Sequence, residues 1–118
     1  METSDMVATV ERYVEAFEKQ DLQMIREMYS ADAHLEDPVG SEARNGIEAV
    51  CEFYEGAFNM GAKLELTGSP RCAGNSVAFP FRVKMPGMAI EVIDVFEFNH
   101  EGKVHNMRAY WGPDNMLK

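Results

Sequence analysis

Hydrophobic residues in the first half of the chain recur at intervals of three and four, the spacing that places them on one face of an α-helix. Residues 4–19 show this pattern with Met6, Val7, Val10, Val14 and Phe17. The same spacing predicts a second helix over residues 21–29, with Leu22, Ile25 and Met28 on one face. A third helix is predicted to start near Asn45 and to carry Ile47, Val50, Cys51, Tyr54 and Phe58.

In the second half of the chain the pattern changes to the alternation that is typical of half-buried strands. Strands are predicted over residues 63–67, 76–84, 89–98 and 104–111. Turn-forming residues separate them at Gly74-Asn75, at residues 85–88 and at residues 99–103. Pro80 lies inside one of these strands and lacks a backbone N–H, so we expect a bulge or a sheet edge there.

Helices followed by antiparallel strands indicate an α+β fold in which three helices pack on one face of a curved antiparallel sheet. A curved sheet backed by helices forms a cone, and its open mouth is a natural apolar pocket. The chain has 118 residues, the size of one domain, so residues 1–118 are predicted to form a single unit.

Charge narrows the range of partners. Eleven Lys and Arg against 20 Asp and Glu give a net charge of −9, which argues against nucleic acid and against anionic membrane surfaces. No apolar run is long enough to span a bilayer, and the acidic N-terminus does not resemble a signal peptide. Cys51 and Cys72 are predicted to be free and mostly buried. We therefore expect a cytoplasmic protein, and its charge is compatible with a neutral, apolar small molecule as ligand.

Asp94 is the most informative polar residue. Strand alternation places it on the same face as Val92, Phe96 and Phe98, whereas Glu91 and Glu97 point the other way. An aspartate on an apolar face is costly unless it is paired or neutral, so its pKa should be raised. It is either a functional acid or a buried side chain bonded to the backbone or to an arginine such as Arg108.

Asp37 and Tyr13 are further candidates. Asp37 precedes Pro38, which favours a turn or strand end and allows a cis peptide bond, and a carboxylate at a pocket mouth suits a general base. The alternative is a solvated turn aspartate. Tyr13 lies beside the apolar stripe of the first helix, and its hydroxyl needs a partner if the ring is buried. Tyr29 and Tyr54 are also predicted to point inward, where the three hydroxyls could form a network, although Tyr13 could equally be an ordinary core residue.

Other kinds of site find little support. His34, His100 and His105 do not have the spacing of metal ligands, so we expect no metal. Neither a phosphate-binding loop nor a dinucleotide fingerprint is present, and Ser41 lacks the pattern around a catalytic serine.

Four segments, in order, resemble the bacterial ketosteroid isomerases, which belong to the nuclear-transport-factor-like superfamily of cone-shaped domains. They are Arg12-Tyr13-Val14, Glu36-Asp37-Pro38-Val39-Gly40-Ser41, Val92-Ile93-Asp94-Val95-Phe96 and Met107-Arg108-Ala109-Tyr110-Trp111-Gly112. The resemblance covers nearly the whole chain. It implies a steroid Δ-isomerase that converts 3-oxo-Δ5-steroids to conjugated 3-oxo-Δ4-steroids without a cofactor, and a homodimer formed through the outer face of the sheet.

The resemblance also implies roles for particular residues. Asp37 would shuttle the proton, while Tyr13 and neutral Asp94 would donate hydrogen bonds to the ketone oxygen, a division of labour known for that family. Tyr29 and Tyr54 would support Tyr13 through their hydroxyls. We expect the substrate-binding pocket to be lined by Phe53, Val83, Met85, Phe96 and Trp111.

Two alternatives belong to different functional classes. Another enzyme on the same cone, such as an epoxide hydrolase or a dehydratase, would need an activated water or a histidine-assisted acid. An Asp-Arg-Asp arrangement would require Arg82 or Arg108 to point into the cavity. A noncatalytic binding module would not need Tyr13, Asp37 and Asp94 together, and the presence of all three therefore favours the isomerase.

Overall fold

Three helices and the first two strands fall within the first 59 residues, and the remaining strands of the sheet follow them. The structure is a computed structural model that describes residues 1–117. The helices are α1 (Thr3–Lys19), α2 (Leu22–Met28) and α3 (Ile47–Asn59), with a short 3₁₀ turn at Pro113–Asn115. The strands are β1 (Tyr29–Glu36), β2 (Arg44–Asn45), β3 (Lys63–Leu66), β4 (Arg71–Ala73), β5 (Ser76–Met85), β6 (Met88–Phe98), β7 (Val104–Tyr110) and β8 (Met116–Leu117).

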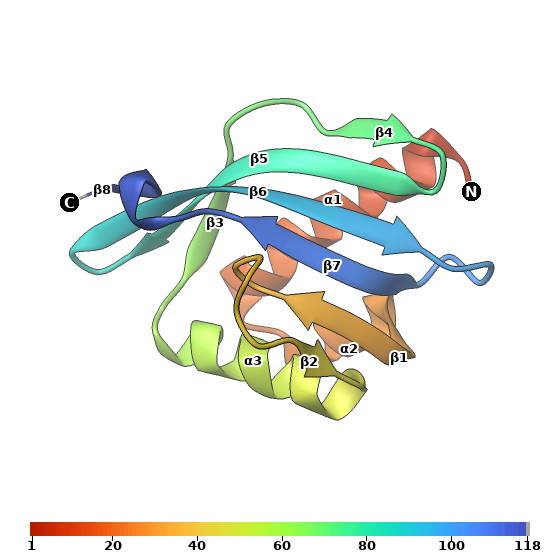
Figure 1. Ribbon diagram of the computed structural model, residues 1–118, viewed down its shortest axis with the longest axis horizontal. Coiled ribbons are helices and arrows are strands. Elements are labelled where there is room, and N and C mark those ends of the chain that lie inside the picture. The colour runs from red at the N-terminus through yellow and green to blue at the C-terminus, as the bar shows by residue number, and fades with distance from the viewer. Residues whose placement is uncertain (118) are drawn as a thin grey trace.

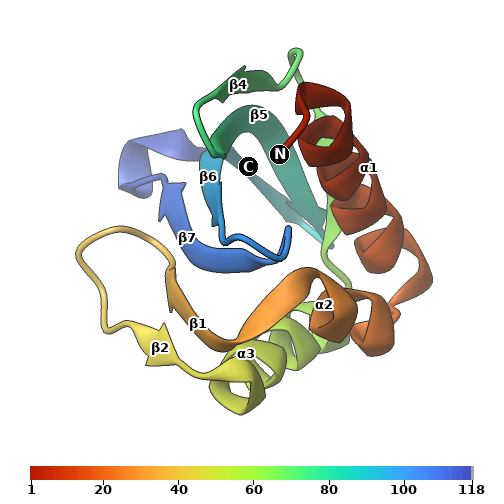
Figure 2. The ribbon, with the colours of Figure 1, turned by 90° about the vertical axis from the view of Figure 1, so that its right-hand side faces the viewer.

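The strands form one curved sheet in the order β2-β1-β7-β6-β5-β3, with β4 paired to β5 and β8 paired to β6 (Figure 1). Figure 2 shows the sheet curving from β1 through β7 and β6 to β5, while α1 closes the open side and α2 and α3 lie below. The predicted α+β class and the cone are confirmed. The sheet is mixed rather than wholly antiparallel, because β1 pairs in parallel with β7. β1 was not predicted, since it follows α2 without a turn.

The apolar stripes of the helices face the inside of the cone. α1 buries Met6, Val10, Tyr13, Ala16 and Phe17, and α3 buries Val50, Cys51, Tyr54 and Phe58. In residues 1–117, none of the helices is long and apolar enough to cross a membrane. Both cysteines are free, as predicted, although Cys72 is only partly buried.

Side-chain hydrogen bonds fix the C-terminal end of α1 against its neighbours. The Lys63 Nζ atom donates to the carbonyl oxygens of Phe17 at 3.1 Å and of Glu18 at 2.8 Å. The Gln20 side chain donates to the carbonyl oxygen of Phe58 at 2.8 Å. The last carbonyls of a helix lack the partners that they would have in its interior, and these bonds add side-chain donors to them. They also hold α1, which carries Tyr13, in a fixed position relative to α3 and β3.

Pro80 lies at a gap in the sheet, as its missing N–H predicts. On one side β5 pairs with β6 without a shift in register, and Pro80 faces Ile93. On the other side β4 pairs only with residues 76–78 and β3 only with residues 81–84. The Pro80 carbonyl points into this gap and accepts a hydrogen bond from the Thr67 N–H at 3.1 Å. The proline therefore costs the sheet no hydrogen bond.

Candidate active site

The wide end of the cone holds an apolar cavity of about 550 Å³. This volume lies within the range of roughly 300–1,000 Å³ that is usual for small-molecule sites. Tyr13 and Phe17 of α1, residues of α3, and the inner faces of β3, β5 and β6 form its wall. Few polar side chains interrupt this wall, and they are the groups that could orient a ligand: Tyr13, Asp37, Arg44, Glu52, Tyr54 and Trp111.

Asp94 lies on the inner face of β6, close to this cavity but behind its wall. It follows Ile90 and Val92, both of which line the cavity, but it is 1% exposed and lies behind the lining. Neither of its carboxyl oxygens has a hydrogen-bond partner within residues 1–117. Burial raises the pKa of Asp94 well above its usual value, the charge of Asp37 raises it further, and the Tyr13 hydroxyl opposes the rise. Burial therefore favours the protonated form of Asp94, which has an O–H to donate.

Three tyrosine hydroxyls form a connected chain beside Asp94. The Tyr54 hydroxyl lies 2.5 Å from that of Tyr29 and 3.1 Å from that of Tyr13. Burial raises the pKa of each of these tyrosines well above its usual value, so all three are neutral. If Tyr29 donates to Tyr54 and Tyr54 to Tyr13, the Tyr13 proton remains free for a ligand. The hydrogen-bonded network of the three tyrosine hydroxyls, which the sequence only suggested, is therefore present.

Asp37 is half-buried on the wall of the cavity, directly after β1. Its peptide bond to Pro38 is cis. The Val39 N–H donates to the Ala109 carbonyl at 2.8 Å, which ties the loop to β7. The indole N–H of Trp111 donates to Asp37 Oδ1 at 2.7 Å. Burial raises the pKa of Asp37, while the Trp111 hydrogen bond and the Arg44 charge oppose the rise and favour the carboxylate.

The structure places four of the five predicted pocket residues on the cavity wall: Phe53, Val83, Met85 and Trp111. The prediction for Phe96 is corrected, because this side chain is 0% exposed and does not line the cavity. Its ring packs edge-to-face against Tyr13 at 5.1 Å and against Phe79 at 5.0 Å. Strand alternation gives the correct face for Phe96, but the narrow end of the cone is filled by aromatic rings and leaves no space for a ligand there.

Two charged residues of the cavity wall, Arg44 and Glu52, were missed in the sequence. Both are exposed. Arg44 belongs to β2, where it pairs with Leu35 of β1. β2 has only two residues, and a strand this short shows no hydrophobic periodicity in the sequence. Glu52 precedes Phe53 on α3, and only the placement of that helix brings it to the cavity.

Arg82 and Arg108, the arginines considered for an Asp-Arg-Asp arrangement, lie on the outer face of the sheet. Arg82 pairs with Glu91 at 3.1 Å, and Arg108 pairs with Glu97 at 3.4 Å. Both glutamates point away from the face that carries Asp94, and neither arginine lines the cavity. The arginine of the cavity is Arg44 instead.

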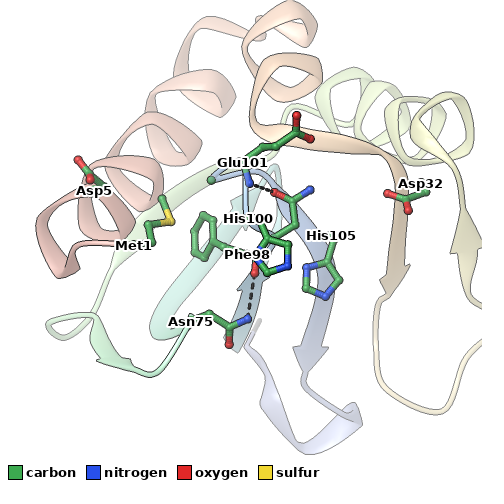
Figure 3. A pocket seen from close by; sticks show the side chains of 10 residues that line it. Met1, Asp5, Asp32, Asn75, Phe98, His100, Glu101 and His105 are labelled. Carbon is green, nitrogen blue, oxygen red and sulfur yellow. Dashed lines mark hydrogen bonds between the residues drawn. The ribbon is translucent and has the colours of Figure 1, made fainter.

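A second, larger hollow of about 950 Å³ lies at the opposite end of the molecule, around the turn between β6 and β7 (Figure 3). His100, Glu101 and His105 lie on one side of it and Met1 and Asp5 of α1 on the other. The two hydrogen bonds drawn in Figure 3 hold the turn itself: Asn75 donates to the Phe98 carbonyl and the Glu101 N–H to Asn99 Oδ1, both at 2.9 Å. This hollow lacks the buried acid and the tyrosines that distinguish the apolar cavity.

Comparison with known proteins agrees with the fold. Residues 10–107 match the SnoaL-like domain, so the chain belongs to the SnoaL-like domain family, a branch of the nuclear-transport-factor-like cone fold. It is 34% identical over 119 aligned residues to the steroid Delta-isomerase of Nocardioides simplex, and the alignment covers 98% of this chain and 96% of that protein. The resemblance to the ketosteroid isomerases is thereby confirmed.

A solved structure in the same family has a different described role. The epoxide hydrolase/cyclase-like enzyme SalBIII, described in pyran ring formation of the polyether salinomycin, superposes with a TM-score of 0.86 at 29% identity. The match covers 92% of each chain. The family therefore includes at least two chemistries on one cone, and the side chains of the cavity must distinguish between them.

Proposed function

We propose that this protein is a steroid Δ-isomerase that moves the double bond of a 3-oxo-Δ5-steroid into conjugation with the ketone. The observation that carries the proposal is the pair of aspartates around one apolar cavity. Asp37 is stabilised as a carboxylate by Trp111 and Arg44, whereas burial without a hydrogen-bond partner keeps Asp94 protonated. One base and one neutral acid are the two groups that a dienolate mechanism needs.

In this mechanism Asp37 moves the proton. Its carboxylate removes a proton from the carbon between the ketone and the double bond, which leaves a dienolate with negative charge on the ketone oxygen. The protonated Asp37 then returns the proton two carbons further along, so no proton is lost to solvent. A base with a modestly raised pKa suits both halves of the transfer, because it must accept a proton and release it again.

Tyr13 and Asp94 stabilise the developing oxyanion. Tyr13 lines the cavity and Asp94 lies next to it, and both hydroxyl groups are neutral donors. A fixed donor aimed at a developing oxyanion is worth about 3–4 kcal/mol in acyl-transfer enzymes. The Tyr29–Tyr54 pair supports Tyr13, because each hydroxyl along the chain polarises the next.

The SalBIII relative favours a second candidate, an epoxide-opening enzyme, and Arg44 on the cavity wall is the observation in this chain that fits it. Such an enzyme uses a carboxylate to activate water and a neutral acid to protonate the epoxide oxygen. Asp37 and Asp94 have suitable protonation states for those roles as well. The tyrosine chain favours the isomerase, because oxyanion stabilisation uses all three hydroxyls.

We also propose that the protein is a homodimer through the outer face of the sheet. Two large apolar side chains are exposed on neighbouring strands there, Ile93 at 48% and Tyr110 at 46%. They face each other across the β6–β7 pairing. Adjacent exposed apolar groups on a sheet commonly mark an interface.

The test of the reaction is an absorbance assay with 5-androstene-3,17-dione that follows the conjugated enone, with Asp37→Asn measured in parallel. We expect rapid enone formation by the native protein and a loss of roughly 10²–10⁴-fold in the variant. Asp37→Asn should still bind the product 4-androstene-3,17-dione, which separates loss of chemistry from loss of binding. Absence of enone formation by the folded native protein would reject the isomerase, and turnover of epoxides would then support the second candidate.

A further inference from the structure

Arg44 differs from every other arginine in having no hydrogen-bond or ion-pair partner for its side chain among residues 1–117. The remaining arginines each donate to a carboxylate or a carbonyl of the chain: Arg12 to Glu27, Arg26 to Glu48, Arg71 to the Ser69 carbonyl, Arg82 to Glu91 and Arg108 to Glu97. Within the described chain the Arg44 guanidinium donates no hydrogen bond and forms no ion pair, although Glu52 and Asp37 lie on the same cavity wall. Its five N–H donors are therefore free to bind a ligand.

The guanidinium is nevertheless held in place. It lies over the ring of Phe53, with Cζ 4.8 Å from the ring centroid. A guanidinium over an aromatic face is held there by cation–π attraction, which does not use its N–H groups as hydrogen-bond donors, so these remain available. Phe53 itself packs edge-to-face against Tyr54 at 5.3 Å, so the stacked arginine is connected to the ordered tyrosines at the bottom of the site.

The position of Arg44 identifies which part of a ligand it can reach. The proposed oxyanion donors, Tyr13 and Asp94, are both buried inside the cone, whereas Arg44 is exposed on the edge strand β2. A steroid whose ketone oxygen contacts Tyr13 must extend toward the mouth. Its opposite end, the D ring and any group attached to it, therefore lies on the side where Arg44 is found.

We infer that Arg44 is a specificity-determining residue that binds a carboxylate on the D-ring end of the steroid. This inference rests on the proposed isomerase function. A planar, stacked guanidinium with free donors matches the two oxygens of a carboxylate. The protein carries a net charge of −9, and Asp37 and Glu52 line the same cavity, so an acidic ligand meets repulsion unless a local cation offsets it. Arg44 is the only arginine or lysine among the lining residues within the described part of the chain.

The test compares the binding of two conjugated 3-oxo-Δ4-steroids that differ only in the group on the D ring. Isothermal titration calorimetry at pH 7 would measure 4-androstene-3,17-dione, which is neutral, and 3-oxo-4-androstene-17β-carboxylate. We expect Arg44→Gln to weaken binding of the carboxylate by about tenfold and binding of the neutral steroid by less than about twofold. The preference of the native protein for the carboxylate should also decrease with added salt, because the mouth of the cavity is accessible to ions.

Arg71→Gln is the matched control. It removes the same charge from an exposed arginine that has no carboxylate partner and does not line the cavity, and it should weaken neither steroid by more than about twofold. Arg44→Lys retains the charge but loses the planar fork, and it should restore part of the preference. If Arg44→Gln affected both steroids equally, or neither, the inference would be overturned while the isomerase remained. If the native protein bound neither steroid, the proposed function itself would fail.

Discussion

The indole N–H of Trp111 donates a 2.7 Å hydrogen bond to Asp37 Oδ1, and this bond connects the residue after β7 to the residue after β1. These residues are 74 positions apart in sequence. They meet because β1 and β7 are neighbours in the sheet, with Glu36 paired to Arg108. The carboxylate oxygen that is bonded to Trp111 is fixed, which leaves Oδ2 for the proton transfer that we propose.

Trp111→Phe should therefore shift the acidic limb of the pH profile. Removal of the donor takes away a contact that lowers the pKa of Asp37, so burial raises that pKa further. Since the base must be ionised, kcat/KM is lost as pH falls through this pKa, and the limb should move to higher pH in the variant. The measurement is kcat/KM for enone formation across the acidic range. An unmoved limb would mean that Trp111 acts only in packing.

The tyrosine chain predicts a graded series of effects. Tyr13→Phe removes the donor itself and should reduce kcat by about 100-fold or more. Tyr54→Phe leaves Tyr13 without its neighbour and should reduce kcat by roughly tenfold, and Tyr29→Phe, at the far end, should have the smallest effect.

Steady-state kinetics of the three variants tests this order, with circular dichroism as the control for folding. Equal losses in all three variants would contradict the assignment of Tyr13 as the donor. An unchanged rate in Tyr13→Phe would make Tyr13 an ordinary core residue.

Asp94 should make stability depend on pH in a defined direction. Between the usual aspartate pKa and the raised pKa of folded Asp94, the folded protein keeps a proton that the unfolded chain has released. Raising the pH through this range therefore favours the unfolded state. Asp94→Asn cannot ionise, so its advantage in free energy of unfolding over the native protein should grow with pH.

Urea denaturation at several pH values measures this difference, and parallel pH curves for the two proteins would show that Asp94 is not kept neutral by the fold. Activity gives an independent check on the same residue. Asp94→Asn should retain more activity than Asp94→Ala, because an amide can still donate a hydrogen bond to the oxyanion.

Substitutions of Phe96 and Val83 should have opposite effects: one should mainly lower the free energy of unfolding, and the other should mainly raise KM. Phe96 is fully buried among aromatic rings, so Phe96→Leu should lower the free energy of unfolding by roughly 1–3 kcal/mol and change KM by less than about twofold. Val83 lines the cavity, so Val83→Ala should raise KM and have the smaller effect on stability. Chemical denaturation and steady-state kinetics of both variants test this. The reverse pattern would mean that Phe96 contacts the substrate, as the sequence predicted.

Ile93 should determine the oligomeric state if the outer face of the sheet is the dimer interface. Ile93→Glu places a charge at the centre of the exposed apolar pair with Tyr110. Sedimentation equilibrium should detect a dimer of the native chain and a monomer of the variant. Glu91→Gln is a control because this side chain lies on the same face but is already paired with Arg82. A native monomer would exclude the proposed homodimer.

Local pattern was sufficient to predict most of the elements. The three helices and the four longest predicted strands lie within a few residues of their predicted ends, because each buries one face and its apolar residues repeat with the period of that element. The same alternation placed Asp94 on the buried face of β6. β1 and β2 were not predicted. β1 starts where α2 ends, and β2 is too short to show a period, so it is their pairing with other strands that defines both.

The sequence by itself determined which side chains point inward, because the periodicities of helix and strand follow from backbone geometry and require no knowledge of the neighbours. It therefore placed Tyr13, Tyr54 and Asp94 inside the cone. Only the tertiary structure decided how deep each of them lies and what it meets there. The taper of the curved sheet put Phe96 in the core, and the pairing of β2 with β1 brought Arg44 to the cavity wall. The contact of Phe96 with Tyr13 joins residues far apart in sequence, and the pairing of β2 with β1 depends on how the loop between them folds back. Packing, rather than local propensity, selects both.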